Sequence, residues 1–236
     1  MLFPHETHEV RGRAEDAFDA AYRDGWMKAL ATTPNARLLY CLRHAHGTGS
    51  SYRVVTITAL RDALAWEQIA ERIHGGDLAS LARSLDGLRH ESVAKLLVPL
   101  PWSPWQSIDL DRVPTDGRTQ RPSLFMEDTV WPFEEKLDEY IERSGSHYAE
   151  EMRKTEDVGR KILTVDASFR TAFGTGRRRE IILWQKVRRP EAMQALLCNE
   201  VPERYRKPGT WMHDALELRD QWESRLLRTV DWSPLA

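Results

Sequence analysis

Short apolar runs recur along the chain and predict β-strands. In the first half they cover residues 2–10, 38–43, 52–58 and 93–100, and in the second half 124–131, 162–173, 180–185 and 225–230. The first two runs of each half enclose apolar side chains at a helical spacing of three to four residues: Phe18, Tyr22 and Trp26, then Leu137, Tyr140 and Tyr148. The last two runs of each half also enclose helical stripes, through Trp66, Ile69 and Ile73, then through Leu78, Leu81, Leu85 and Leu88, and in the second half through Met193, Leu196, Ala215, Leu216 and Trp222. Each half therefore predicts the order β-α-β-β-α-β.

Two short motifs repeat in the same order. His46-Gly47-Thr48-Gly49 recurs as Phe173-Gly174-Thr175-Gly176, and Trp102-Ser103-Pro104 recurs as Trp232-Ser233-Pro234. The two offsets are nearly equal, which indicates a tandem duplication. We therefore predict an N-terminal half over 1–106 and a C-terminal half over 123–236. The polar segment 107–122, which lacks periodicity, is predicted to be the linker.

The pattern also resembles a known superfamily. The residues that carry the resemblance are the two β-α-β-β-α-β halves, the helix with Trp66-Glu67-Gln68-Ile69-Ala70-Glu71-Arg72, and the strand that ends in Pro101-Trp102-Ser103-Pro104. They look like the dimeric α/β-barrel superfamily, closest to its NIPSNAP-like branch. The resemblance implies an α+β fold in which two tandem ferredoxin-like halves form a fused dimeric α/β barrel.

Members of that superfamily carry out many chemistries. They include cofactor-free oxygenases, small isomerases and lactonases, polyketide cyclases, haem-degrading enzymes and the haem-binding chlorite dismutase group. The resemblance therefore implies a fold and a range of activities, but it selects none of them.

Composition narrows the function classes further. Hydrophobic residues make up 41% and charged residues 30%, and the net charge is −2. A protein without a cationic excess is not expected to bind nucleic acid. The polar N-terminus and the lack of a long apolar run predict no signal peptide and no membrane span, so the expected location is the cytoplasm. Cys41 and Cys198 are interpreted as small buried hydrophobes, with no disulfide framework or structural zinc site.

Histidines are distributed unevenly between the halves. Six of the eight lie in the first half: His5, His8, His44, His46, His74 and His90. Duplicated units often keep one working pocket, so we predict that the principal pocket lies in the N-terminal half.

Strand order brings candidate catalytic residues to one end of that half. In the order 4-1-3-2, strands 1 and 2 lie about 10 Å apart, on either side of strand 3. His8, His44 and His46 are the candidate acid–base residues, because imidazole transfers protons near neutral pH. Arg43 and Tyr52 are the candidates that stabilise or orient a developing negative charge.

Other interpretations of these residues stay open. His5, His8, His44 and His46 are also compatible with structural or surface positions. His44-Ala45-His46 has the spacing of two metal ligands on one strand face, with His8 or Glu9 as a third, but we assign no metal. The Gly-Thr-Gly segments are interpreted as hairpin turns, and Arg177-Arg178-Arg179 as a solvated loop.

The nine tryptophans suggest an aromatic lining for a pocket. Trp102, Trp105 and Trp131 cluster beside prolines at strand ends, and with His5 they form the predicted substrate-binding set. Core packing is the alternative explanation for these rings.

The predicted function is therefore a cofactor-independent acid–base enzyme, a lyase, isomerase, cyclase or oxygenase, acting on a small aromatic or apolar substrate. No cofactor is predicted, and haem with a histidine axial ligand is the runner-up. A non-catalytic small-molecule-binding module is the third hypothesis. Expected partners are a small molecule and, in a homodimer, a second copy of the chain.

Overall fold

The computed structural model describes residues 1–154, 162–173, 178–198 and 203–236. The second Gly-Thr-Gly turn lies outside the described residues. Contacts divide the chain into two compact units. The first unit comprises Met1–Val98, Ser107–Ser123 and Leu226–Ala236, and the second comprises Pro99–Gln106 and Leu124–Arg225.

The first repeat has the predicted element order. Its strands are β1 (Phe3–Val10), β2 (Ala36–His44), β3 (Arg53–Leu60) and β4 (Arg89–Pro99). Its helices are α1 (Glu15–Ala20), α2 (Met27–Ala31), α3 (Ala63–His74) and α4 (Ala79–Leu88), with short turns η1 (Gly12–Ala14), η2 (Ala21–Trp26) and, in the linker, η3 (Leu110–Arg112). The antiparallel strand order is β4-β1-β3-β2.

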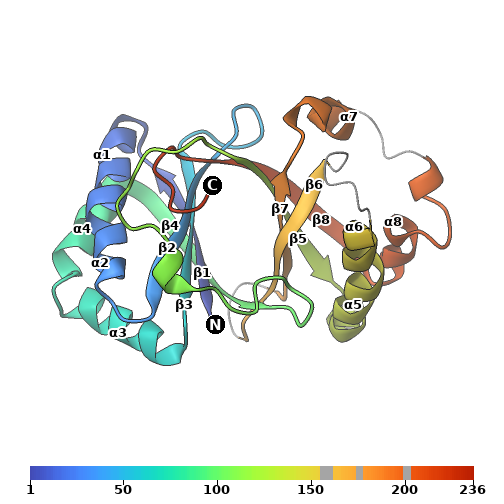
Figure 1. Ribbon diagram of the computed structural model, residues 1–236, viewed down its shortest axis with the longest axis horizontal. Helices are drawn as coiled ribbons and strands as arrows, with labels where there is room; N and C mark the ends of the chain where they lie inside the picture. Colours follow the sequence, from blue (N-terminus) through green and yellow to red (C-terminus); the bar gives the residue numbers. More distant parts are fainter. Residues whose placement is uncertain (155–161, 174–177, 199–202) are drawn as a thin grey trace. The chain divides into compact units, whose positions relative to one another are not determined.

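Helices α1 to α4 cover one face of this sheet (Figure 1). Side chains spaced along the first helical segment, Phe18, Tyr22 and Trp26, pack with Val10 and Val54 of the strands into one buried cluster. Asp62 accepts a hydrogen bond from the amide of Ala65 at 2.9 Å, so a capping side chain begins α3. The predicted helical stripe therefore forms the core between the helices and the sheet.

The second repeat has the same order of elements. Its strands are β5 (Leu124–Pro132), β6 (Leu163–Thr171), β7 (Ile181–Val187) and β8 (Arg219–Thr229). Its helices are α5 (Leu137–Arg143), α6 (Glu150–Lys154), α7 (Met193–Cys198) and α8 (Trp211–Asp214), with turns η4 (Glu134–Lys136), η5 (Ser144–Ala149), η7 (Pro190–Ala192), η8 (Glu203–Tyr205) and η9 (Ala215–Glu217). The strand order, β8-β5-β7-β6, matches that of the first repeat.

The match extends to individual residues. A bulge interrupts the β2–β3 register between Leu38 and Tyr40, and an equivalent bulge interrupts β6–β7 between Val165 and Ala167. The first helical segment of each repeat includes a π-helical turn, η2 and η5. These shared irregularities confirm the predicted duplication, because neither is required by a ferredoxin-like sheet as such.

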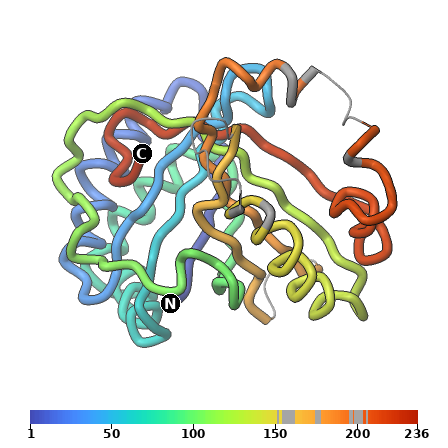
Figure 2. The backbone as a smooth tube through the Cα atoms, turned by 45° about the vertical axis from the view of Figure 1, so that its right-hand side comes forward, coloured from blue at the N-terminus to red at the C-terminus, as the bar shows by residue number. Residues whose placement is uncertain are grey.

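The repeats exchange their final segments. After β4 the chain joins the second unit, where the amide of Leu100 donates to Ser168 O at 2.9 Å. After β8 it joins the first unit, where the amide of Val230 donates to Cys41 O at 3.0 Å. In Figure 2 the end of the chain runs beside the segment before β5, and the amide of Gln120 donates to Asp231 O at 2.7 Å. The compact units therefore differ from the sequence halves 1–106 and 123–236.

Some element boundaries differ from the predictions. Strands β4 and β8 begin at Arg89 and Arg219, earlier than the predicted 93 and 225. The residues that follow Arg89 and Arg219 are exposed and mostly polar, so no apolar alternation marks these segments as strand. Trp222 lies in β8 and not, as predicted, in a helix. Among the described residues, no helix is long and apolar enough to cross a lipid bilayer.

Candidate functional site

A cavity with a volume of about 820 Å³ lies in the second unit. It opens between α5 and the end of β6. Its lining residues are Pro101, Trp102, Glu134, Leu137, Asp138, Ile141, Glu142, Arg170, Thr171, Ala172, Phe173, Arg178 and Arg179. We call it the second-unit cavity.

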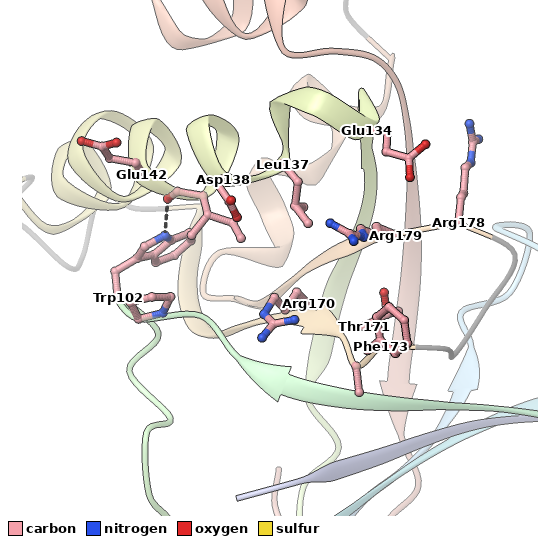
Figure 3. A pocket seen from close by; sticks show the side chains of 13 residues that line it. Trp102, Glu134, Leu137, Asp138, Glu142, Arg170, Thr171, Phe173, Arg178 and Arg179 are labelled. Atoms are coloured by element: carbon pink, nitrogen blue, oxygen red, sulfur yellow. Dashed lines mark hydrogen bonds between the residues drawn. The ribbon is translucent and has the colours of Figure 1, made fainter.

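Two arginines of the second-unit cavity have no counter-ion among the described residues. Arg170 is the penultimate residue of β6, and Arg179 precedes β7. Both guanidinium groups point into the space below α5 in Figure 3, whereas Arg178 points away. Arg178 donates to Gln221 at 2.7 Å and lies over the Trp131 ring. Within the described chain, neither Arg170 nor Arg179 forms an ion pair or a side-chain hydrogen bond, so both are available to an anion.

Apolar side chains form the wall beside these arginines. Leu137 and Ile141 lie one turn apart on α5. The indole N–H of Trp102 donates to Ile141 O at 2.8 Å, which fixes the ring against the helix (Figure 3). Gly145 leaves room for that ring, because a Cβ there would lie 2.5 Å from Trp102 Cδ1. The second-unit cavity therefore combines a cationic floor with an apolar wall.

A smaller cavity, about 400 Å³, occupies the corresponding position of the first unit. We call it the first-unit cavity, and it is lined by Asp19, Arg43, His44, Ala45, His46, Arg228, Thr229, Val230 and Asp231. Arg43 is the penultimate residue of β2, as Arg170 is of β6. Unlike Arg170, it forms ion pairs with Glu15 at 3.1 Å and with Asp19 at 2.5 Å.

The equivalent positions of α5 explain this difference. Glu15 begins α1 and Leu137 begins α5, so the two residues correspond, as do Asp19 and Ile141 one turn later. The duplicated helix thus carries two carboxylates against Arg43 and two aliphatic side chains at the same places near Arg170. Burial raises the pKa of Asp19, and the Arg43 guanidinium opposes that shift. Arg43 is therefore neutralised within the protein, and Arg170 is not.

His8 lies elsewhere, buried on the helix-covered face of the first sheet. Its ring contacts Phe18 and Tyr22. The Nδ1 atom accepts a hydrogen bond from Arg89 at 2.7 Å, because a guanidinium can only donate. Nε2 therefore carries the proton, 3.1 Å from the Tyr22 hydroxyl and 3.2 Å from the Thr56 hydroxyl.

Burial, followed by the nearby charges of Arg89 and His5, lowers the pKa of His8 to about 3. His8 is thus neutral near pH 7. Thr56 in turn donates to Glu6 at 3.4 Å, and burial raises the pKa of that carboxyl group. The network joins a guanidinium to a carboxyl group through a neutral histidine, and His8 lines neither the first-unit nor the second-unit cavity.

The predicted catalytic set is therefore divided. Arg43, His44 and His46 line the first-unit cavity. Tyr52 is about half exposed, and its ring lies against Gly12. The expectation that His8 and Tyr52 share a pocket with the hairpin histidines does not hold, because His8 faces the helices.

The predicted substrate-binding set is divided as well. Trp102 lines the second-unit cavity. Trp105 packs edge-on against Phe169, and the Trp131 indole N–H donates to Glu180 at 3.1 Å. His5 is buried on the sheet face opposite His8, as the alternation of a strand requires.

That the principal pocket lies in the N-terminal half stays a prediction: each unit contains a cavity, and the one in the second unit has the greater volume of the two. None of the described lining residues of the second-unit cavity is a histidine, so the histidine count does not point to it. A comparison of aligned charges would have been more informative: Arg43 and Arg170 align in the sequence repeat, but the carboxylates before Arg43 have no counterpart before Arg170.

Haem does not fit the residues of the second-unit cavity. None of its described lining residues is His, Cys, Met or Tyr, the side chains that ligate haem iron. In the first-unit cavity, both ring nitrogens of His44 are inaccessible to solvent. Across the described residues, no group of three His, Cys, Asp or Glu side chains is placed to hold a metal ion.

Known family models and curated proteins give no match to this chain. Solved structures do match over nearly its full length. A protein from Fusobacterium nucleatum, provisionally named a monooxygenase, has a TM-score of 0.57 and 9% identity, and the match covers 97% of this chain and 91% of that one. Chlorite dismutase from Candidatus Nitrospira defluvii has a TM-score of 0.53 and 8% identity, covering 98% and 92%. A NIPSNAP domain protein from Burkholderia xenovorans, at 20% identity and a TM-score of 0.36, covers 43% of this chain and 96% of its own.

The similarities over nearly the full length confirm the predicted fold. The chain is an α+β protein with two tandem ferredoxin-like repeats. At such low identity the similarity concerns the fold alone.

Proposed function

We propose that the protein binds a small amphipathic carboxylic acid in the second-unit cavity. The carboxylate binds Arg170 and Arg179, and the apolar body packs against Leu137, Ile141 and Trp102. The volume of about 820 Å³ lies within the usual range for small-molecule sites.

One observation carries this proposal: Arg170 lacks the two carboxylates that neutralise Arg43. A guanidinium binds carboxylates well because its planar donors match two oxygens at once. The substitution of Leu137 and Ile141 for the acidic residues also supplies the apolar surface that an amphipathic ligand needs. The aliphatic residues that replace the acids in α5 thus leave Arg170 able to bind the ligand carboxylate and provide an apolar surface for the rest of the ligand.

A second candidate is acid–base catalysis in the first-unit cavity. Its support is that Arg43, His44 and His46, three of the predicted catalytic residues, line one cavity. His46 is exposed there and is the candidate acid–base group. Under this candidate, His46→Ala abolishes turnover of a small aromatic substrate and leaves thermal unfolding unchanged. Normal turnover in the variant would remove it.

Calorimetric titration with 3-phenylpropionate tests the first proposal. We expect saturable binding to the wild-type protein. Arg170→Gln should weaken binding about tenfold, because a charge-assisted hydrogen bond contributes on the order of 1.5 kcal/mol. Arg83→Gln, an exposed arginine of α4, serves as the control and should leave the affinity unchanged. Equal affinities for wild type and Arg170→Gln would contradict the proposal.

A further inference from the structure

The helical wall of the second-unit cavity also carries negative charge. Glu134 and Asp138 lie one turn apart, in η4 and α5, and both line the cavity. Over the described part of the chain neither has an ion-pair or hydrogen-bond partner for its carboxylate. Glu139 of the same helix, by contrast, pairs with Lys136 at 2.8 Å and with Arg143 at 3.4 Å. Glu139, which does not line the cavity, is thus neutralised, whereas Glu134 and Asp138 have no such partner among the described residues.

Opposite charges face each other across this cavity without meeting. Figure 3 shows Asp138 above Arg170, with Glu134 on the far side of Arg179. No salt bridge joins any two of these four described residues, so each acid lies more than 4 Å from each guanidinium, and the space between them accommodates ligand atoms. A purely anionic ligand would satisfy the arginines but would lie near two unpaired carboxylates.

The two repeats can be compared for these charges as well. In the first repeat the position equivalent to Glu134 is Gly12 and the position equivalent to Asp138 is Asp16, while the carboxylates of Glu15 and Asp19 contact Arg43 directly. In the second repeat the acidic residues Glu134 and Asp138 flank Leu137 and form no ion pair with Arg170. Acidic and basic side chains therefore both line the second-unit cavity without pairing with one another.

We infer that the ligand is a zwitterion with an apolar body, of the class of an aromatic or aliphatic α-amino acid. The inference rests on the proposed function and deepens it. The ligand carboxylate binds Arg170 and Arg179, its ammonium group lies by Asp138 and Glu134, and its side chain packs against Trp102 and Ile141.

Three probes that share a phenyl group test this inference: L-phenylalanine, 3-phenylpropionate and phenethylamine. Calorimetry should rank them in that order, with L-phenylalanine about threefold tighter than 3-phenylpropionate, as expected for partly exposed ion pairs. In Glu134→Gln/Asp138→Asn the preference should disappear or reverse. The control Glu135→Gln/Glu203→Gln removes the same net charge from exposed residues that do not line the cavity, and it should retain the wild-type ranking.

The outcomes separate the two proposals. If 3-phenylpropionate binds as tightly as L-phenylalanine, or if the acidic double variant keeps the preference, the zwitterion inference is overturned and the carboxylate site stands. If Arg170→Gln binds both carboxylate probes as well as wild type does, the site itself is wrong. Failure of all three probes to bind at millimolar concentration would overturn both.

Discussion

An arginine at the end of a strand either forms ion pairs within the protein or remains able to bind a ligand. The side chains of the neighbouring helix determine which of these it does. Arg43 has Glu15 and Asp19 within ion-pair distance, whereas Arg170 has Leu137 and Ile141 at the same helical positions. The charge is identical in both cases. Only the first is compensated by the protein, so the two residues should differ in their effect on stability and on binding.

Substitution of each arginine by glutamine tests that difference. Arg43→Gln should lower the free energy of unfolding by about 1–2 kcal/mol, because Asp19 loses the partner that compensates its burial. Arg170→Gln should change it by less than about 0.5 kcal/mol, since the arginine contributes no ion pair. Urea denaturation measures both. A larger loss for Arg170→Gln would contradict the assignment of roles.

His8 makes stability depend on pH. Its pKa is about 3 in the folded protein and near the ordinary 6.5 in the unfolded chain, so below pH 6.5 protons bind preferentially to the unfolded state. Stability from this group is complete above pH 6.5 and falls by about 1.4 kcal/mol per pH unit as the pH drops towards 3. His8→Gln should have a slope of stability against pH that is shallower by that amount between pH 6 and 4. Equal slopes would show that His8 titrates normally.

At the scale of elements, the contact between Trp102 and η5 holds the wall of the second-unit cavity in place. Gly145→Ala would insert a Cβ 2.5 Å from Trp102 Cδ1, so the ring must move and the cavity must change shape. We expect a loss of about 1–3 kcal/mol in stability and weaker binding of 3-phenylpropionate.

The matched control is Gly87→Ala in α4, where an added Cβ meets no atom within 4 Å. That substitution should stabilise the protein by about 0.5–1 kcal/mol through helix propensity alone. Thermal unfolding and calorimetry together separate the two effects. If Gly145→Ala were also stabilising and bound the probe normally, Trp102 would have no positioning role.

At the scale of the whole molecule, the exchange of final segments depends on two equivalent serines. Ser103 Oγ accepts a hydrogen bond from the amide of Ser168 at 2.9 Å, and Ser233 Oγ accepts one from the amide of Cys41 at 3.2 Å. Both contacts are buried. Ser103→Ala and Ser233→Ala should each cost about 1–3 kcal/mol of stability by leaving a buried amide unsatisfied.

Ser146→Ala, an exposed serine of η5, is the control for these variants and should change stability little. Chemical denaturation of the three variants measures the effect. If either buried serine behaved like Ser146, its contact would not stabilise the exchanged segment.

Local pattern was sufficient to predict the fold. The apolar stripes and the paired Gly-Thr-Gly and Trp-Ser-Pro motifs specify two similar β-α-β-β-α-β repeats, because helix and strand periods depend on neighbouring residues only. The site was not predictable in this way. Trp102 belongs to the first repeat but lines a cavity of the second unit, and such an exchange of segments leaves no periodic trace in the sequence.

The histidine positions illustrate the same limit. His8 and His44 lie at nearby strand ends, yet the alternation of strand faces directs His8 towards the helices. The partners of a charged residue carry more information than its type. Arg43 and Arg170 occupy equivalent sequence positions, and only the surrounding helix distinguishes them.

The central claim is that a small carboxylic acid binds in the second-unit cavity. Titration of ¹⁵N-labelled protein with 3-phenylpropionate, followed by NMR, tests it most directly. The account predicts saturable shifts centred on the backbone amides of Leu137, Ile141 and Arg170 and on the indole N–H of Trp102. Shifts centred on Arg43, His44 and His46, or no saturable shifts at millimolar probe, would contradict it.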